Sequence, residues 1–201
     1  MKKIVLLDLG ANNGCSLRKF AATYVDFPEW EVHAFEPGTV GKSIKMKETL
    51  ERFKNVKFYE NPASDSSREM TFFEHTENNS ASTSWEPKAN DTRRRGDCGS
   101  DIKGEVKKST HISVSIPDLM KEIIEKEPNS EFYIKCDIEG EEYRVIPAIL
   151  EEGLFERVSM LHIEWHEEWR GTNQSGAYLT KKIKEQNPEI VIDNHWNALG
   201  Y

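Results

Sequence analysis

The chain has 201 residues, enough for one sizeable hydrophobic core and short for two, so a single domain is expected over residues 1–201. Its composition, 31% charged and 37% hydrophobic residues, is typical of a soluble globular protein. The formal net charge of −8 argues against binding to a nucleic-acid backbone, because such binding requires a basic face.

The N-terminal sequence and the cysteines indicate a cytoplasmic protein. No apolar run is long enough to span a bilayer, and residues 2–9 hold too few apolar residues for a signal peptide. Cys15, Cys98 and Cys136 are odd in number and lack CxxC spacing, so we predict reduced thiols. The abrupt start at a strand leads us to expect a domain taken from a longer protein.

Strands and helices alternate along the first sixty residues. Apolar runs predict buried strands at residues 2–9, 30–37 and 56–60. Residues 15–27 and 40–54 carry apolar side chains at helical spacing and lie between these strands. The alternation predicts right-handed crossovers and a parallel sheet.

The middle of the chain, residues 61–109, is rich in Ser, Thr, Asn, Asp and Gly. Only residues 68–75 resemble a strand, so we predict a polar insertion that forms a loop or a lid. Trp85 and its polar neighbours are candidates for binding an acceptor, and Arg93–Arg95 for contacting an anionic group. A solvated, disordered loop explains the same composition.

Beyond the insertion the alternation resumes. Strands are predicted at residues 110–116, 131–140, 158–166 and 189–196, and helices at residues 117–127, 141–155 and 175–186. We therefore predict an α/β fold with a central, mainly parallel sheet flanked by helices.

The sequence DLGANNG, residues 8–14, follows the first predicted strand directly. Gly10 and Gly14 allow close approach of a ligand to the backbone, and the next helix begins with free N–H groups. Their spacing does not fit the G-x-G-x-x-G pattern of dinucleotide enzymes. Asp8 would repel a phosphate and attract a sulfonium, which favours S-adenosylmethionine, although an ordinary strand–helix turn also explains the glycines.

Acidic residues follow the second and third strands as well. Glu36 lies 22 residues beyond Gly14, and a carboxylate at this point can accept hydrogen bonds from both ribose hydroxyls. The third strand leads into NPASD, where Asp65 or a nearby backbone amide is a candidate contact for an adenine edge. Asp after Ser is also ordinary turn chemistry.

Several motifs together resemble the FkbM-type methyltransferases. In the family's order and spacing, the chain contains DLGANNG, FEP, NPASD, KCDIEGEEYRVI and HIEWH. The run from Lys135 to Glu141 resembles the family signature K-x-D-x-E-G-x-E. The resemblance extends from Ile4 to about His166 and is weakest over residues 84–109.

This resemblance implies a Rossmann-like class I methyltransferase fold that binds S-adenosylmethionine. It also implies O-methylation, commonly of a sugar hydroxyl in a glycan or glycosylated metabolite. The cofactor contacts that it implies are Asp8, Gly10, Asn12, Gly14, Glu36, Ala63, Ser64 and Asp65. Methyltransferases of this fold usually end in a pair of antiparallel strands, whereas residues 189–196 offer one strand, so we expect a truncated pair.

A sugar hydroxyl needs a general base, or a metal that lowers its pKa, before it can attack a methyl group. Asp137 and Glu139 alternate along a predicted strand and should face the same side. In one mechanism His166 is the base, and these two carboxylates orient it and the sugar. In the other, Asp137 and Glu164 bind Mg²⁺ or Mn²⁺, with His166 as a further ligand in one variant.

The remaining polar residues of these strands have simpler explanations. Lys135, inside an apolar strand, is expected to reach a carboxylate, and His162 is expected to be structural. A favourable negative charge at a helix start is an alternative explanation for Glu139 and, above all, for Glu141. Two other functions fit the fold: methylation of a small phenol or amine, and a non-catalytic scaffold that binds S-adenosylmethionine.

Overall fold

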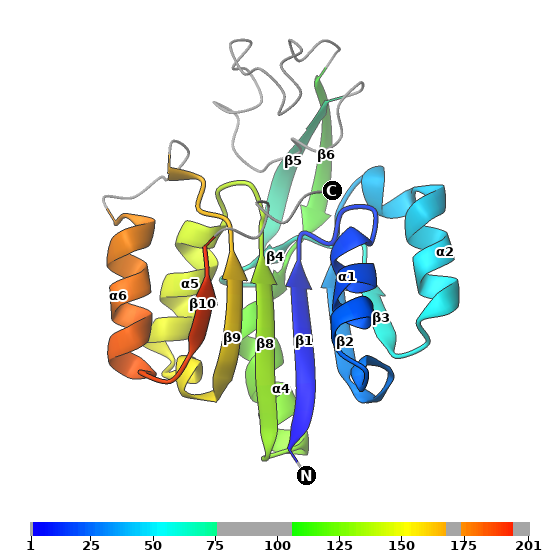
Figure 1. Cartoon of the computed structure of the whole chain (residues 1–201). Helices are drawn as coiled ribbons and strands as arrows, with labels where there is room; N and C mark the ends of the chain where they lie inside the picture. Colours follow the sequence, from blue (N-terminus) through cyan, green and yellow to red (C-terminus); the bar gives the residue numbers. More distant parts are fainter. Residues whose placement is uncertain (1, 76–105, 168–173, 195–201) are drawn as a thin grey trace.

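The structure, a computed structural model, describes residues 2–75, 106–167 and 174–194. Its centre is a six-stranded sheet in the order β10-β9-β8-β1-β2-β3, and every neighbouring pair is parallel (Figure 1). The strands are β1 (Lys3–Leu9), β2 (Glu31–Phe35), β3 (Val56–Tyr59), β8 (Ser130–Cys136), β9 (Val158–Ile163) and β10 (Val191–Asp193). The predicted α/β, Rossmann-like architecture is therefore confirmed.

Helices pack against both faces of the sheet, and they are α1 (Cys15–Thr23), α2 (Ile44–Arg52), α4 (Ile116–Lys126), α5 (Glu142–Glu151) and α6 (Gly176–Gln186). Val5, Leu7 and Leu9 of β1 belong to the core on the side of α4, α5 and α6. Leu6 belongs to the core on the side of α1 and α2. Successive side chains of a strand point to opposite faces, which explains why a continuous apolar run fills both cores.

Short polar side chains define where three helices begin. Ser43, Ser115 and Ser175 each accept a hydrogen bond from the backbone N–H three residues later, at 3.2–3.3 Å. Pro117 lies in the first turn of α4, as predicted. Pro147 lies inside α5, which nonetheless runs without interruption from Glu142 to Glu151.

The predicted strand at residues 110–116 is divided into two. β6 (Val106–Ile112) pairs antiparallel with β5 (Glu69–His75), and β7 (Val114–Ser115) pairs with β4 (Ala63–Ser64). Between them, the Ser113 hydroxyl donates to the backbone carbonyl of Ser66 at 2.7 Å and accepts from the N–H of Arg68 at 3.0 Å. We call the antiparallel pair of β5 and β6 the ribbon. The bonds of Ser113 lie at the point where the chain leaves the ribbon, and neither β6 nor β7 joins the central sheet.

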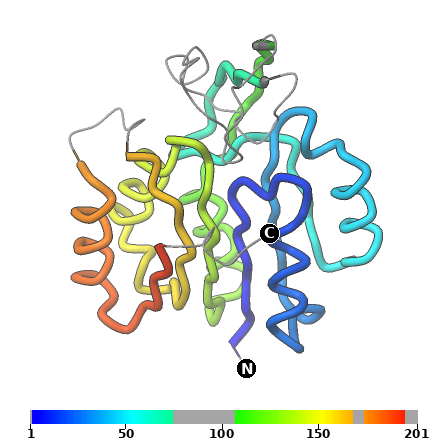
Figure 2. Tube along the Cα trace, turned by 45° about the horizontal axis from the view of Figure 1, so that its top comes forward, coloured from blue at the N-terminus to red at the C-terminus, as the bar shows by residue number. Residues whose placement is uncertain are grey.

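The structure describes part of the predicted insertion at residues 61–109. Residues 68–75 include β5, as predicted, while β6 begins at Val106, inside a stretch that we expected to be loop. Figures 1 and 2 show the β5–β6 ribbon rising from the edge of the sheet where the parallel strands end. Residues 76–105, with Trp85 and Arg93–Arg95, lie outside the described residues.

The C-terminal part of the sheet is short. β10 pairs in parallel with β9, and no antiparallel strand joins the six-stranded sheet within the described residues. Residues 195–201 lie outside them. None of the helices that the structure describes is long and apolar enough to cross a membrane.

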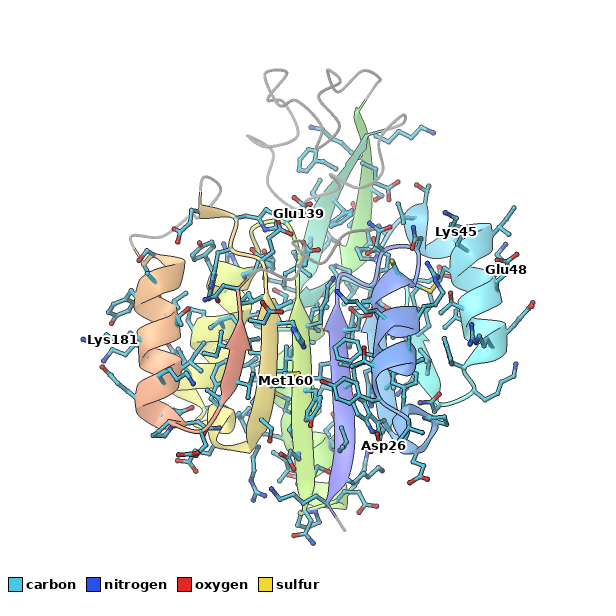
Figure 3. All side chains as sticks on the ribbon, viewed as in Figure 1. Asp26, Lys45, Glu48, Glu139, Met160 and Lys181 are labelled. Carbon is cyan, nitrogen blue, oxygen red and sulfur yellow. The ribbon has the colours of Figure 1, made fainter. Side chains whose placement is uncertain are left out.

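Charged side chains cover the outer surfaces of the helices. Figure 3 shows Lys45 and Glu48 of α2 and Lys181 of α6 pointing away from the sheet. Glu139, by contrast, lies above the ends of the strands. A position on the outer surface of a helix therefore does not explain this charged side chain.

Candidate active site

A cavity opens at the edge where the parallel strands end. Its polar lining comes from the loops that follow β1, β2 and β8, and comprises Gly10, Asn12, Glu36, Asp137, Glu139 and Glu141. The rest of its lining is apolar. Ile138 belongs to the loop after β8, and we call the other apolar residues the apolar wall: Phe35, Pro37, Pro62, Ala63, Met70 and Phe72. In open α/β sheets this crevice is where ligands bind.

The backbone of the turn after β1 lies in close contact with the backbone of the loop after β8. Gly10 has φ +83°, and a Cβ atom there would lie 1.9 Å from the carbonyl oxygen of Asp137. The N–H groups of Gly10 and Ala11 donate to the carbonyl of Phe35 at 3.0 and 2.9 Å. Only glycine fits this position, so the sequence fixes how closely the loops after β1 and β8 approach.

Asn12 and Gly14 complete the turn. Asn12 has a left-handed backbone, φ 49°, and its N–H donates to the Glu36 carboxylate at 2.8 Å. Gly14, with φ +80°, is the residue before the first turn of α1. It does not line the cavity itself.

Glu36 is the one acid of the second strand's loop that reaches the cavity. Its side chain is largely buried, and burial raises the pKa of Glu36 to about 8, although the Asn12 N–H and the Lys135 charge act against this. A partly desolvated carboxylate beside an apolar wall suits a neutral partner with hydroxyl donors, such as a ribose.

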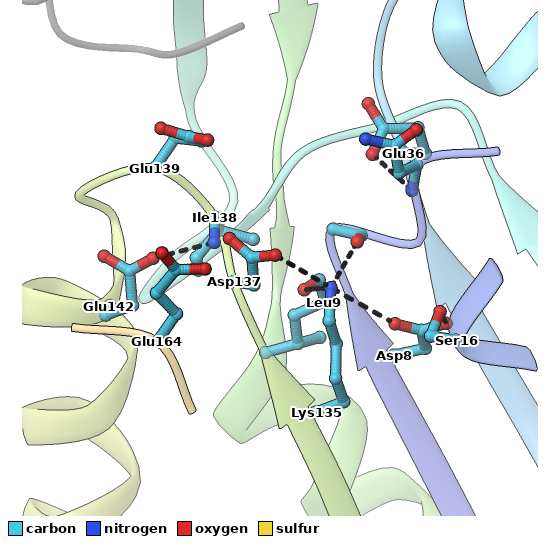
Figure 4. Close-up of polar contacts among 12 residues, drawn as sticks. Asp8, Leu9, Ser16, Glu36, Lys135, Asp137, Ile138, Glu139, Glu142 and Glu164 are labelled. Carbon is cyan, nitrogen blue, oxygen red and sulfur yellow. Dashed lines mark hydrogen bonds and ion pairs between the residues drawn. The ribbon is translucent and has the colours of Figure 1, made fainter. Parts of the chain in front are cut away.

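Asp8 lies beneath the cavity and does not line it. The side chain is fully buried, accepts a hydrogen bond from Ser16 and lies 3.8 Å from Lys135 Nζ (Figure 4). Burial raises the pKa of Asp8, and the charge of Lys135 and the hydroxyl of Ser16 oppose that rise. We expected Asp8 to attract a sulfonium directly, whereas its carboxylate faces partners inside the protein.

Lys135 connects two of the loops. Its ammonium donates to the carbonyls of Gly10 and Leu9, at 2.5 and 3.4 Å, and lies 3.5 Å from Asp137 Oδ2. The prediction that Lys135 reaches a carboxylate is confirmed. Lys135 is only 3% exposed, so its positive charge lies inside the protein, where it offsets the buried charge of Asp8.

Only one of the three residues predicted to contact the adenine lines the cavity. Ala63 lines the cavity, but Ser64 and Asp65 do not. The Ser64 hydroxyl lies 2.6 Å from Glu141 Oε1 and 2.8 Å from Asp65 Oδ1. Although burial opposes it, the bond from Ser64 and the charge of Arg68 hold the pKa of Asp65 below its ordinary value.

The Glu141 carboxylate holds the segment that contains Ser64 and Arg68. Its Oε1 accepts a hydrogen bond from Arg68 Nη2 at 2.5 Å as well as from Ser64. Our explanation by helix charge alone missed these partners, since they come from a distant part of the sequence. These contacts connect β4 to the start of α5 at the lining of the cavity.

The ribbon supplies Met70 and Phe72 to the apolar wall. Glu74, buried on the same strand, accepts a hydrogen bond from the Thr39 N–H at 3.2 Å, which connects the ribbon to the loop after β2. Next to it, a Cβ atom on Gly38 would lie 1.7 Å from Glu74 Oε1. The sequence analysis missed this contribution because these residues lie within a polar segment.

The loop after β8 is not the extended strand that we predicted. β8 ends at Cys136, and Glu139 has a left-handed backbone with φ 58°, which costs about 1–2 kcal/mol for a residue other than glycine. Strand alternation is therefore the wrong reason for the proximity of Asp137 and Glu139. A tight turn brings them together, and strained turns of this kind are common at functional sites.

His166 lies directly behind this turn. Its Nε2 is 3.5 Å from Glu139 Oε2 and 4.0 Å from Asp137 Oδ1, while its Nδ1 is 3.0 Å from Glu142 Oε1. Asp137, Glu139 and His166 each offer one ligand atom within 4.8 Å of the others, close enough to share a metal ion. Glu164, our predicted ligand, lies 3.9 Å from His166 Nε2 and is not in that set of three.

This geometry agrees with the comparison against known families. The family model described as the methyltransferase FkbM domain matches residues 8–191. The chain belongs to the FkbM methyltransferase family. FkbM membership makes it a methyltransferase that uses S-adenosylmethionine. No curated protein and no solved structure matches the chain.

Sequence reasoning missed Glu142, whose carboxylate lies 3.0 Å from His166 Nδ1 in the FkbM protein. The signature K-x-D-x-E-G-x-E has eight positions and ends at Glu142, whereas the run that we singled out stopped at Glu141. Counting all eight positions would have identified it. Figure 4 shows the Glu142 carboxylate bonded to the N–H of Ile138, inside the turn.

His162 of the FkbM protein is structural, as predicted. Its Nδ1 lies 3.1 Å from Asp193 Oδ2, and its ring packs edge-on against Phe20. Burial lowers the pKa of His162, although the bond to Asp193 opposes this. Its contacts connect β9 to β10 and α1, below the level of the cavity.

Proposed function

We propose that this FkbM methyltransferase methylates a sugar hydroxyl, for instance in a deoxyhexose such as rhamnose within a glycan, with His166 as the general base. The observation that carries the proposal is the position of His166. Its Nε2 lies within 4.0 Å of Asp137 and Glu139, both of which line the cavity. An imidazole beside two carboxylates suits proton removal from a polyhydroxylated acceptor.

The cavity fits the methyl donor at its other side. S-adenosylmethionine, when bound, supplies an electrophilic methyl group. Glu36 would hold the ribose hydroxyls, and the apolar wall would hold the adenine. The turn from Gly10 to Asn12, which also lines the cavity, would lie beside the amino-acid portion.

The acceptor would be prepared by the chain's own groups. His166 Nε2 accepts the proton of the attacking hydroxyl, because a protonated hydroxyl is a poor nucleophile. Asp137 and Glu139 accept hydrogen bonds from neighbouring sugar hydroxyls and stabilise the imidazolium that forms. Precise placement of the oxygen supplies a further part of the rate.

A metal-assisted version has its own observation, the set formed by Asp137, Glu139 and His166. Carboxylate oxygens with one imidazole are donors that Mg²⁺ and Mn²⁺ accept. Such an ion would lower the pKa of the acceptor hydroxyl. Activity that is lost in EDTA and restored by Mn²⁺ supports this version, and full activity in EDTA excludes it.

The experiment is incubation of the full chain with S-adenosylmethionine and a panel of deoxyhexose glycosides, with a phenol and a primary amine included. Mass spectrometry should show the gain of one methyl group on a glycoside. Methylation of the phenol or the amine alone would contradict the sugar assignment. Donor binding without methylation of any acceptor would favour the scaffold without activity.

A further inference from the structure

Glu142 is the first residue of α5 and is fully buried, with an exposed fraction of 0%. Its Oε1 accepts a hydrogen bond from the Ile138 N–H at 2.7 Å, and its Oε2 accepts one from the Gly140 N–H at 2.8 Å. The same Oε1 lies 3.0 Å from His166 Nδ1. A buried carboxylate is tolerated when its oxygens are bonded, and these three contacts meet that need.

The contact with Nδ1 restricts the proton of the imidazole. An ionised carboxylate only accepts hydrogen bonds, so Nδ1 must donate. The neutral ring then carries its proton on Nδ1 and a lone pair on Nε2, the nitrogen nearer to Asp137 and Glu139. This is the form that a general base requires, and a metal-ligating imidazole requires it equally.

We propose that Glu142 is a positioning residue, which fixes the tautomer of His166 and holds the turn of Asp137 and Glu139 with the same carboxylate. The catalytic meaning of this assignment rests on the proposed function. Among the described residues, the other acids with a contact to the ring are further away: Glu139, Glu164 and Asp137 lie 3.5, 3.9 and 4.0 Å from Nε2. Glu142 itself does not line the cavity.

The test reads the tautomer directly. In protein labelled with ¹⁵N-histidine, long-range ¹H–¹⁵N correlation spectra distinguish protonated from bare ring nitrogens, and H166Q assigns the signal. With the pH raised until the ring is neutral, wild-type His166 should show a proton on Nδ1. In E142A the proton should move to Nε2 for a large share of molecules, because Nδ1 has lost its acceptor.

The matched control is E151A, which removes an exposed glutamate from the same helix and should leave the spectrum unchanged. E142A should also lower kcat about 100-fold and leave the dissociation constant for S-adenosylmethionine within about threefold. If E142A does not fold, the wild-type spectrum decides, since a proton on Nε2 and a bare Nδ1 would overturn the assignment.

The two proposals can fail separately. A tautomer that is the same in wild type and folded E142A overturns the role of Glu142, even in an active enzyme. A tautomer that shifts as expected, in a protein that methylates no glycoside, supports the role of Glu142 and contradicts the proposed function.

Discussion

The two sides of the cavity differ in their chemistry. On the side of the apolar wall, the Glu36 carboxylate accepts a hydrogen bond from the Asn12 N–H. Opposite it, the loop after β8 presents Asp137 and Glu139, with His166 behind them. Binding a large, mostly neutral group needs the first arrangement, whereas moving a proton needs the second. The contrast supports our proposal that one side holds the donor and the other activates the acceptor.

The largest expected effect comes from His166. H166A removes the proposed base without touching the apolar wall, so kcat should fall about 1000-fold while donor affinity stays within about threefold. Initial rates at saturating donor and calorimetric titration of the same variant measure the two quantities. A parallel loss of donor affinity would contradict the division between the two sides.

Lys135 lies beneath both sides and connects them. K135M leaves Asp8 fully buried without its cation, which should lower the free energy of unfolding by about 3 kcal/mol or more. Urea denaturation followed by circular dichroism measures this. The control K181M removes an exposed lysine of α6, whose surface ion pair should contribute less than about 1 kcal/mol. Equal stability of the two variants would show that Lys135 has no structural role.

The donor side is tested by Glu36. E36A should weaken binding of S-adenosylmethionine about 10- to 100-fold, because hydrogen bonds to a charged group contribute about 1.5–3 kcal/mol. At saturating donor, kcat should change little. E60A, which removes an exposed glutamate just after β3, is the matched control. Donor affinity that is identical in E36A and wild type would remove Glu36 from the site.

The smallest expected effect is a pH dependence on the same side. The pKa of Glu36 is about 8 in the free protein, and hydroxyl donors bind the ionised carboxylate better than the neutral acid. Donor affinity should therefore rise by up to about tenfold between pH 7 and pH 9, and level off above that range. Calorimetry in buffers of different ionisation enthalpy should detect proton release on binding at pH 7. Affinity that is flat between pH 6 and pH 8 would contradict this.

The sequence predicted the parts of the site that are encoded locally. Strand alternation with helices identified the parallel sheet, and the turn from Asp8 to Gly14 followed from glycine positions. Glu36 followed from its place at the end of a strand. Each of these depends on residues that are neighbours in the chain or on a regular period.

The rest depends on contacts between distant segments. The left-handed turn at Glu139 is stabilised by Glu142, and Glu141 is engaged by Ser64 and Arg68. The ribbon that carries Met70 and Phe72 depends on pairing across the polar insertion. Periodicity in the sequence does not predict such contacts. For this reason our explanation of Glu139 by strand alternation was wrong, and Glu142 was missed.

The most direct test is a crystal structure of the full chain with S-adenosylhomocysteine, the demethylated donor. We predict ribose hydroxyls bonded to Glu36, the adenine against Met70 and Phe72, and the sulfur facing the side of Asp137 and His166. A ribose bound by Asp137 and Glu139 instead, or an empty cavity at saturating ligand, would contradict the separation of donor binding from acceptor activation.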